Sequence, residues 1–210
     1  MAKVAAVILA AGRSLRWRAE GGVEETKLAA PLAGRPIVRV VAEAALSSRA
    51  APVVVVLGHA RERVAATLAG LPVTFVVNPD FMSGIASSLS VGLTATPADA
   101  DGAIVLLGDM PKVEARLIDA LIAAFEARPD ARAVAPVQNG RRGNPVLIGR
   151  SLFDRARRLE GDEGARRLIA ALDERDIVEL AAQDWDASFD VDTPADLAAA
   201  IQDGHKPTGW

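Results

Sequence analysis

Residues 4–16 read VAAVILAAGRSLR, an apolar run followed at once by small residues and then by positive charge. The short run Val4–Leu9 carries β-branched residues and predicts a buried strand. Val53–Leu57 and Ala103–Leu107 have the same character, which is typical of parallel strands that are buried on both faces. A buried strand followed by a loop with Gly12 brings backbone N–H groups close to a ligand, so this stretch favours an α/β fold that binds phosphate.

The rest of the chain alternates short strands with longer helical patterns. Further strands are expected at residues 73–77, 133–137, 146–148 and 177–180, and helices at residues 36–45, 61–68, 87–93, 115–127, 152–159 and 165–172. A last helix begins clearly, because Thr193 is a suitable N-cap and Pro194 fits the first helical position. We therefore expect a single domain over residues 1–202, a mostly parallel sheet with helices on both faces, and a loose tail at 203–210.

The composition excludes several classes of protein. The 210 residues are 50% hydrophobic and 24% charged, which suits one globular domain. A net charge of −3 with 4% aromatic residues is unsuited to binding a nucleic-acid backbone. The chain has no cysteine for disulfides or thiolate sites, and His59 and His205 are too few for a His-rich zinc site. We see neither a membrane segment nor a signal peptide, so the expected location is the cytoplasm.

Function is expected in the loops that follow the parallel strands, where such sheets bind ligands. After the first strand, Gly12 is followed by Arg13, Arg16, Arg18 and later Lys27, a pattern that suits a triphosphate. The alternative is a solvated basic loop in which Gly12 serves a turn. The residues that flank the lysine speak against a P-loop, and the lack of further glycines speaks against a dinucleotide fingerprint.

Carboxylates follow the strand at 103–107. Asp109 comes after Gly108 and before a proline turn, where it is well placed to hold Mg²⁺ at the ligand edge of the sheet. The alternative for Asp109 is to cap the next helix. Asp192 would complete the metal site, unless Asp190 and Asp192 only serve the N-terminus of the last helix; sequence spacing does not separate these two interpretations.

Polar loops elsewhere offer further contacts. Residues 78–89 place Asn78, Ser87 and Ser88 where they would read a base or a sugar, or alternatively form a Ser-capped helix after a proline turn. The loops at 141–145 and 161–166 also fit ordinary turn chemistry.

Taken in order, these segments resemble the MobA/MocA-like nucleotidyltransferases, and among them the molybdenum cofactor cytidylyltransferases. The resemblance covers nearly the whole chain. The matching segments are LAAGRSLR at 9–16, KL at 27–28, NP at 78–79, GIASSL at 84–89, LGDMP at 107–111, RGNPV at 142–146, GDEGAR at 161–166 and DVDTP at 190–194.

The resemblance implies a Rossmann-like nucleotidyltransferase fold with a mixed sheet, divided into a nucleotide-binding half (1–112) and an acceptor-binding half (113–202). The phosphate of molybdopterin would attack the α-phosphorus of CTP and release pyrophosphate. Arg16, Lys27 and Asp109 would be catalytic, with Mg²⁺, or alternatively Mn²⁺, on Asp109 and Asp192. The implied partners are CTP, molybdenum cofactor and a molybdenum hydroxylase or its chaperone, with no nucleic acid and no membrane.

The resemblance also implies residue roles. The nucleotide would be bound by Leu9, Ala10, Ala11, Gly12, Arg13, Ser14, Asn78, Ser87, Ser88 and Gly108. The acceptor would be bound by Arg142, Asn144, Asp162 and Arg166. The run of two alanines and one glycine at 10–12 resembles the cytidylyl branch rather than the guanylyl branch.

The chain departs from the family pattern at several positions. Arg18 replaces a glycine, Thr26 stands where Asn is common, and Asn144 stands where His is frequent. The stretch 19–26 is longer than usual and carries Glu20, Glu24 and Glu25.

Three other functions stay open at this point. In the first, the chain is a nucleotidyltransferase that acts on another small phosphorylated acceptor. In the second, it is an NAD(P)-dependent oxidoreductase related to the family. In the third, it binds nucleotide as a chaperone or regulator and catalyses no reaction. The missing glycine fingerprint speaks against the oxidoreductase.

Overall fold

The computed structural model describes residues 1–182, 185 and 189–202. Within these residues, eight strands form one central sheet in the order β10-β7-β9-β6-β1-β4-β5, with β8 paired to β7. The strands are β1 (Val4–Ala10), β4 (Val53–Leu57), β5 (Thr74–Val77), β6 (Gly102–Leu107), β7 (Ala133–Gln138), β8 (Arg141–Arg142), β9 (Val146–Gly149) and β10 (Ile177–Ala181).

The sheet is mixed and mostly parallel, as expected. Strand β1 lies at its centre, parallel to both β4 and β6, and Leu9 pairs with Val56 on one side and Leu107 on the other. Strands β8 and β9 are antiparallel to their neighbours. Because parallel strands end at the same edge, the loops after β1, β4 and β6 meet there.

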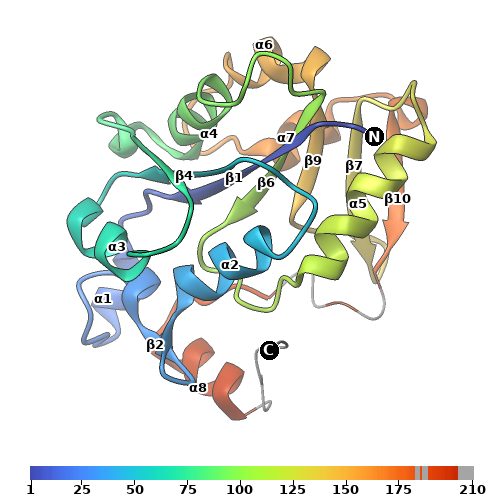
Figure 1. Ribbon diagram of the computed structural model, residues 1–210. Coiled ribbons are helices and arrows are strands. Elements are labelled where there is room, and N and C mark those ends of the chain that lie inside the picture. Colours follow the sequence, from blue (N-terminus) through green and yellow to red (C-terminus); the bar gives the residue numbers. More distant parts are fainter. Residues whose placement is uncertain (183–184, 186–188, 203–210) are drawn as a thin grey trace.

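Helices cover both faces of the sheet (Figure 1). One face carries α2 (Ile37–Leu46), α3 (Arg61–Thr67) and α5 (Ala115–Ala127), and the other carries α4 (Ile85–Thr94), α6 (Phe153–Ala156) and α7 (Ala165–Ala170). Short 3-10 helices lie at Lys27–Ala29, Phe81–Ser83, Arg150–Leu152 and Glu174–Asp176. None of the helices in the described part of the chain has the length and hydropathy needed to cross a membrane.

Alternate residues of β1 build two separate layers of core. Ile8 packs with α2 and α5 on one face, whereas Val7 packs with α4 on the other, and both side chains are fully buried. Burial on both faces explains why the strand is apolar at every position. Burying one such side chain contributes about 1.5–3 kcal/mol to stability, so the centre of the sheet is a rigid base for the loops at its edge.

A third, smaller core lies beyond that edge. It joins α1 (Leu15–Ala19), the hairpin of β2 (Pro31–Leu32) and β3 (Arg35–Pro36), and α8 (Pro194–Gln202), which gather at one end of the molecule in Figure 1. Trp17, Leu32, Ile37 and Val191 are buried together there. This small core brings the end of the chain beside the loop that follows β1.

The sequence predicted the main helices and, except for β8, the strands of the main sheet within a few residues. It did not predict α1 or the β2–β3 hairpin, because both are short and carry no periodic pattern of their own. The expected loose tail at 203–210, with His205, lies outside the described residues.

Candidate active site

A cleft of about 590 Å³ opens at the carboxyl ends of β1 and β6. It collects side chains from both ends of the chain. The sequence-predicted residues that line it are Leu9, Ala11, Gly12, Arg13, Ser14, Arg16, Lys27, Ser88, Asp109, Asp162 and Asp192. The three residues expected to be catalytic and the two expected to bind metal therefore share one cavity.

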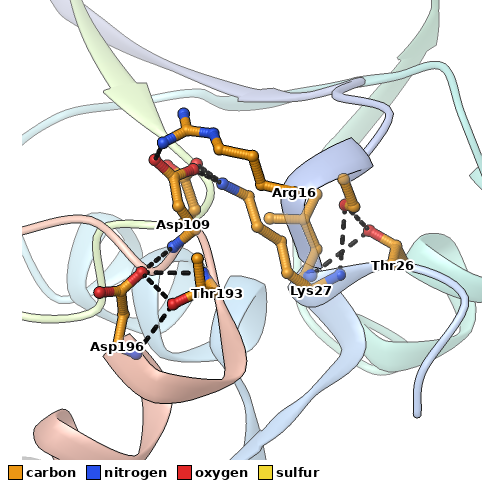
Figure 2. Close-up of polar contacts among 9 residues, drawn as sticks. Arg16, Thr26, Lys27, Asp109, Thr193 and Asp196 are labelled. Atoms are coloured by element: carbon orange, nitrogen blue, oxygen red, sulfur yellow. Dashed lines mark hydrogen bonds and ion pairs between the residues drawn. The ribbon is translucent and has the colours of Figure 1, made fainter. Parts of the chain in front are cut away.

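A compact ion cluster forms the polar end of the cleft. The Lys27 ammonium lies 2.6 Å from Asp109 Oδ2 and 2.6 Å from Asp192 Oδ1. The Arg16 guanidinium contacts the other oxygen of Asp192, also at 2.6 Å. Figure 2 shows the side chains of Arg16 and Lys27 converging on the carboxylates. Two cations and two carboxylates thus form a chain of ion pairs from Arg16 through Asp192 and Lys27 to Asp109.

Lys27 is charged in this setting. Its side chain is only 11% exposed, and burial by itself lowers the pKa of an amine. The attraction and hydrogen bonds from Asp109 and Asp192 outweigh the burial, so the pKa of Lys27 lies above its usual 10.5. The site therefore keeps a full ammonium charge at neutral pH.

Asp190 lies next to this cluster and feels its negative charge. Partial burial raises the pKa of the Asp190 carboxyl, and the charges of Asp192 and Asp109 raise it further. The structure gives Asp190 no contact with Arg16 or Lys27. Of the two carboxylates in the DVDTP segment, Asp192 is the one that joins the cluster.

Backbone and side-chain hydrogen bonds fix the segment that carries Asp192. Val191 N donates to the carbonyl oxygen of Asp109 at 3.0 Å, which ties this segment to the end of β6. The carboxylate of Asp196 accepts hydrogen bonds from Asp192 N, Thr193 N and Thr193 Oγ1, at 2.8 to 3.0 Å (Figure 2). Thr193 Oγ1 accepts in turn from Asp196 N, so α8 begins with a capping box.

The cap leaves Asp196 strongly ionised. Desolvation raises the pKa of its carboxyl, but the hydrogen bonds from Thr193 and Asp192 outweigh that effect and hold the pKa below the usual 3.8. Thr193 thus serves the helix as expected, while Asp192 is free to face the cleft.

Lys27 is held by a second set of contacts. Thr26 is fully buried; its hydroxyl accepts from Leu28 N and lies 3.1 Å from Ser14 Oγ. Lys27 N donates to Ser14 Oγ at 3.2 Å. Thr26 therefore caps the 3-10 helix that begins at Lys27, which explains how threonine serves at a position where the family commonly has asparagine.

The carboxylates fit a divalent cation that is completed by a nucleotide. Asp109 Oδ1 is buried and accepts no hydrogen bond from the part of the chain that the structure describes. No group of three metal-ligating side chains occurs among the described residues. Mg²⁺ in phosphate-binding sites commonly uses one or two carboxylates together with phosphate oxygens and water. Asp109 and Asp192 are such a donor pair.

Asn78 and its two serine partners organise the start of α4. The buried Asn78 amide donates to Ser87 Oγ at 2.8 Å and to Ser88 Oγ at 3.0 Å, and its oxygen accepts from Asp80 N. Of these three predicted residues, only Ser88 lines the cleft. Ala10 and Gly108 are buried and are not among the lining residues, and an added Cβ at Gly108 would come 3.1 Å from the Leu9 carbonyl oxygen.

The predicted acceptor residues are less concentrated. Asp162 lines the cleft, whereas Arg142 pairs with Glu179 at 2.7 Å and Arg166 is exposed on α7. Asn144 lies between β8 and β9. The structure does not bring Arg142, Asn144 or Arg166 into the cleft lining.

Close backbone packing joins the loop at 161–166 to the start of α4. Gly84 has a φ of +109°, and a Cβ there would lie 2.1 Å from the Gly161 carbonyl oxygen. Ala86 N donates to that same oxygen at 3.1 Å. Gly84 is thus required both for its backbone conformation and for this contact.

An apolar wall of the cleft was missed from the sequence. It is formed by Leu15, Phe81, Met82 and Ile85, and the side chains of Leu15 and Met82 are 52% and 69% exposed. The signal was present, since apolar residues at 81, 82 and 85 surround a glycine just after a strand. The capping box of Thr193 and Asp196 could likewise have been found from its three-residue spacing.

The comparisons with known proteins agree with this geometry. The MobA-like NTP transferase domain matches residues 6–176. The chain is 32% identical to the purine catabolism protein PucB of Bacillus subtilis (strain 168) over 198 residues, which cover 90% of this chain and 91% of PucB. It is also 32% identical to the bifunctional protein GlmU of Syntrophotalea carbinolica over 174 residues, or 83% of this chain. That match covers only 34% of GlmU, so the chain spans about a third of such relatives.

Solved structures share the fold over nearly the whole chain. Rv0371c from Mycobacterium tuberculosis H37Rv matches with a TM-score of 0.82 and 26% identity, over 96% of this chain and 98% of that protein. A complex of Rv0371c with manganese gives a TM-score of 0.79 at 24% identity, over 95% and 98% of the two chains. The match to the domain over most of the length, together with the cleft, shows that this chain belongs to the MobA-like NTP transferase family and is a nucleotidyltransferase.

Proposed function

We propose that the chain transfers CMP from CTP to the phosphate of molybdenum cofactor, forming molybdopterin cytosine dinucleotide and pyrophosphate. The observation that carries nucleotidyl transfer is the cluster of Arg16, Lys27, Asp109 and Asp192 in one cleft at the carboxyl edge of the sheet. Cations for a triphosphate lie beside carboxylates for a divalent metal, and both sets face the same cavity.

The chemistry fits these side chains. A bond forms between an acceptor phosphate oxygen and the α-phosphorus, and the bond from the α-phosphorus to the β-phosphate oxygen breaks. The acceptor oxygen is already ionised, so the step needs no general base. Lys27 and Arg16 neutralise charge that accumulates on the leaving pyrophosphate. A divalent metal on Asp109 and Asp192 supplies Lewis-acid activation of the α-phosphate when it is bound.

The metal is proposed to be Mg²⁺, with Mn²⁺ as an alternative. The unpartnered oxygen of Asp109 supports a cation at this position. The manganese complex of Rv0371c supports the same class of metal, since that protein has this fold.

The choice of CTP as donor and of molybdenum cofactor as acceptor rests on the sequence motifs. The segment 10–12 supports CTP through its resemblance to the cytidylyl branch. The acceptor, and a hydroxylase of the xanthine dehydrogenase type as recipient, rest on the resemblance to the molybdenum cofactor cytidylyltransferases. We place this reaction in the cytoplasm, where CTP is available.

The test is pyrophosphate release with freshly prepared molybdenum cofactor and Mg²⁺, run in parallel with CTP, GTP and ATP. We expect release with CTP, and a product whose mass equals that of the cofactor plus CMP. If none of the three nucleotides releases pyrophosphate while CTP still binds, the acceptor assignment is wrong. A sugar 1-phosphate and NADPH, tested next, cover the other acceptor class and the oxidoreductase alternative.

A further inference from the structure

Lys27 occupies the space between the two carboxylates that would bind metal. Its ammonium nitrogen is equally close to Asp109 and Asp192, at 2.6 Å from one oxygen of each. A magnesium ion bound to both carboxylates would sit about 2.0–2.1 Å from their oxygens, which is the same region of the cleft. An ion held by the same two oxygens that contact the ammonium would therefore compete with it for this position, which leaves Asp109 Oδ1 as the oxygen without a partner among the described residues.

We propose that Lys27 holds the cation position in the nucleotide-free enzyme, so that the site takes its divalent cation only together with the nucleotide, as a metal–nucleoside triphosphate complex. This inference rests on the proposed nucleotidyl transfer, and it assigns Lys27 a role before chemistry begins.

The burial of Lys27, Asp109 and Asp192 explains why a free metal ion does not enter between the two carboxylates. The side chains of Lys27, Asp109 and Asp192 are 11%, 20% and 18% exposed. A free metal ion entering between the carboxylates would leave the ammonium partly buried, without its partners and beside a dication. Removing one partner of such a pair is strongly unfavourable, because it leaves a charge uncompensated. A triphosphate removes the obstacle, since its oxygens accept the ammonium as the metal arrives.

The rest of the site is built for this exchange. The backbone of Lys27 is fixed through Thr26 and Ser14, and Asp192 is fixed through Asp196, so the side-chain ends alone need to move. The lysine side chain is a flexible four-carbon stem that can carry its ammonium from carboxylate to phosphate. Arg16 covers the remaining oxygen of Asp192 but is 71% exposed and free to turn toward the phosphates.

The first test measures Mn²⁺ binding to the nucleotide-free enzyme by electron paramagnetic resonance. We compare the wild type with Lys27→Met and with Lys3→Met as the matched control. Lys3 forms a pair with Asp99 at the same 2.6 Å, but on the exposed surface with both side chains 67% exposed. We expect K27M to bind Mn²⁺ more tightly by a factor in the range of roughly 5 to 150 that is usual for coupled sites. We expect K3M to match the wild type.

The second test measures CTP affinity with and without Mn²⁺, in the absence of any acceptor. In the wild type, Mn²⁺ should strengthen CTP binding, and CTP must strengthen Mn²⁺ binding by the same factor. That factor should fall in K27M. Thermal unfolding confirms that the variant is folded, and Lys27→Arg, which keeps the charge, should retain the weak Mn²⁺ binding of the free enzyme.

Two results would overturn the inference: equal Mn²⁺ affinity in folded K27M and wild type, or wild-type Mn²⁺ affinity that does not change with CTP. The second of these also decides the matter if K27M does not fold. Both tests omit molybdenum cofactor, so a wrong acceptor leaves them unaffected. A chain that binds no nucleoside triphosphate at all would instead overturn the proposed function.

Discussion

The two halves of the chain differ in how closely their candidate functional residues are grouped. Arg16, Lys27 and Asp109 of the first half contact one another directly or through Asp192, which the second half contributes. In the second half, the predicted acceptor residues are spread out, and of them only Asp162 lines the cleft. The side chains proposed to handle phosphate and metal thus form one ion cluster, whereas those proposed to bind the acceptor form no comparable cluster among the described residues.

The sheet explains this contrast. The half proposed to bind nucleotide uses the parallel strands β1 and β6, whose carboxyl ends meet at one edge with the loops of several segments. In the acceptor half, β9 runs antiparallel between β6 and β7, and Val146 pairs with Val105 near the end of β6. Residues 142–145 thus border the same edge but lie outside the cleft lining.

The largest expected effect is at Asp109. We expect Asp109→Asn to lower pyrophosphate release by about 10²- to 10³-fold, the size of effect seen when one preorganised electrostatic group is removed from a transition state. The fold should persist, because Asp109 lies at a strand end and not in the apolar core. The control is Asp99→Asn, which changes an exposed carboxylate elsewhere. Near-normal turnover in D109N would break the assignment.

Substitutions of Lys27 and Arg16 should weaken CTP binding to different extents. We expect Lys27→Met to weaken CTP binding by roughly 10- to 100-fold, in line with the loss of a charged hydrogen bond. Arg16→Met should have a smaller effect, because Arg16 is largely exposed and its interactions are screened by solvent. Titration calorimetry with CTP and Mg²⁺ measures both. Equal losses would show that burial does not set the ranking.

Asp196 should influence the metal requirement by holding the backbone of Asp192 in place. Asp196→Ala removes a helix cap, which costs about 0.5–2 kcal/mol of stability. It also releases the backbone of Asp192, so we expect the Mg²⁺ concentration for half-maximal rate to rise several-fold while kcat changes less. Metal titrations of the rate check this, and Asp196→Asn, which keeps one acceptor oxygen, should recover part of the loss. An unchanged metal requirement would limit Asp196 to the stability of α8.

Asp196 also makes the stability of the folded chain depend on pH. The pKa of Asp196 is lower in the folded chain than its usual 3.8, so its contribution to stability is present above that pH and is lost as the pH falls through the folded pKa. The stability difference between wild type and D196A should therefore shrink below about pH 4, measured by urea unfolding over a pH series. A difference that stays constant to pH 2 would contradict this reasoning.

The smallest effects on nucleotide handling are expected in the acceptor half. Arg166→Ala and Arg142→Ala should leave the KM for CTP unchanged and raise the KM for the acceptor by a few fold. Arg142 loses only a partly exposed pair with Glu179, worth about 0–1 kcal/mol of stability. Steady-state kinetics with each substrate varied in turn provides the comparison. A raised KM for CTP in either variant would place that residue on the nucleotide side.

The sequence was sufficient to predict some residues of the candidate site but not the contacts between them. The residues after β1 and β6 could be found because a buried strand followed by small and charged residues has few other uses. That Lys27 joins Asp109 to Asp192 could not be found, because the contact spans 165 positions and depends on a small core around Trp17 and Val191. No local pattern encodes such a contact.

Other features exceeded the reach of sequence reasoning for similar reasons. Asn78 is buried and bonded to Ser87 and Ser88, so its role as a brace for α4 follows only from its neighbours in space. The wall at Phe81 and Met82 lies on a single turn of 3-10 helix, which is too short for any periodic signal.

The most direct test of the account is a crystal structure of the enzyme with CTP and Mn²⁺. We predict an anomalous manganese peak between the carboxylates of Asp109 and Asp192, with the Lys27 ammonium moved onto the phosphates. A manganese ion bound elsewhere, or Lys27 still lying between the two carboxylates with nucleotide in the cleft, would contradict it.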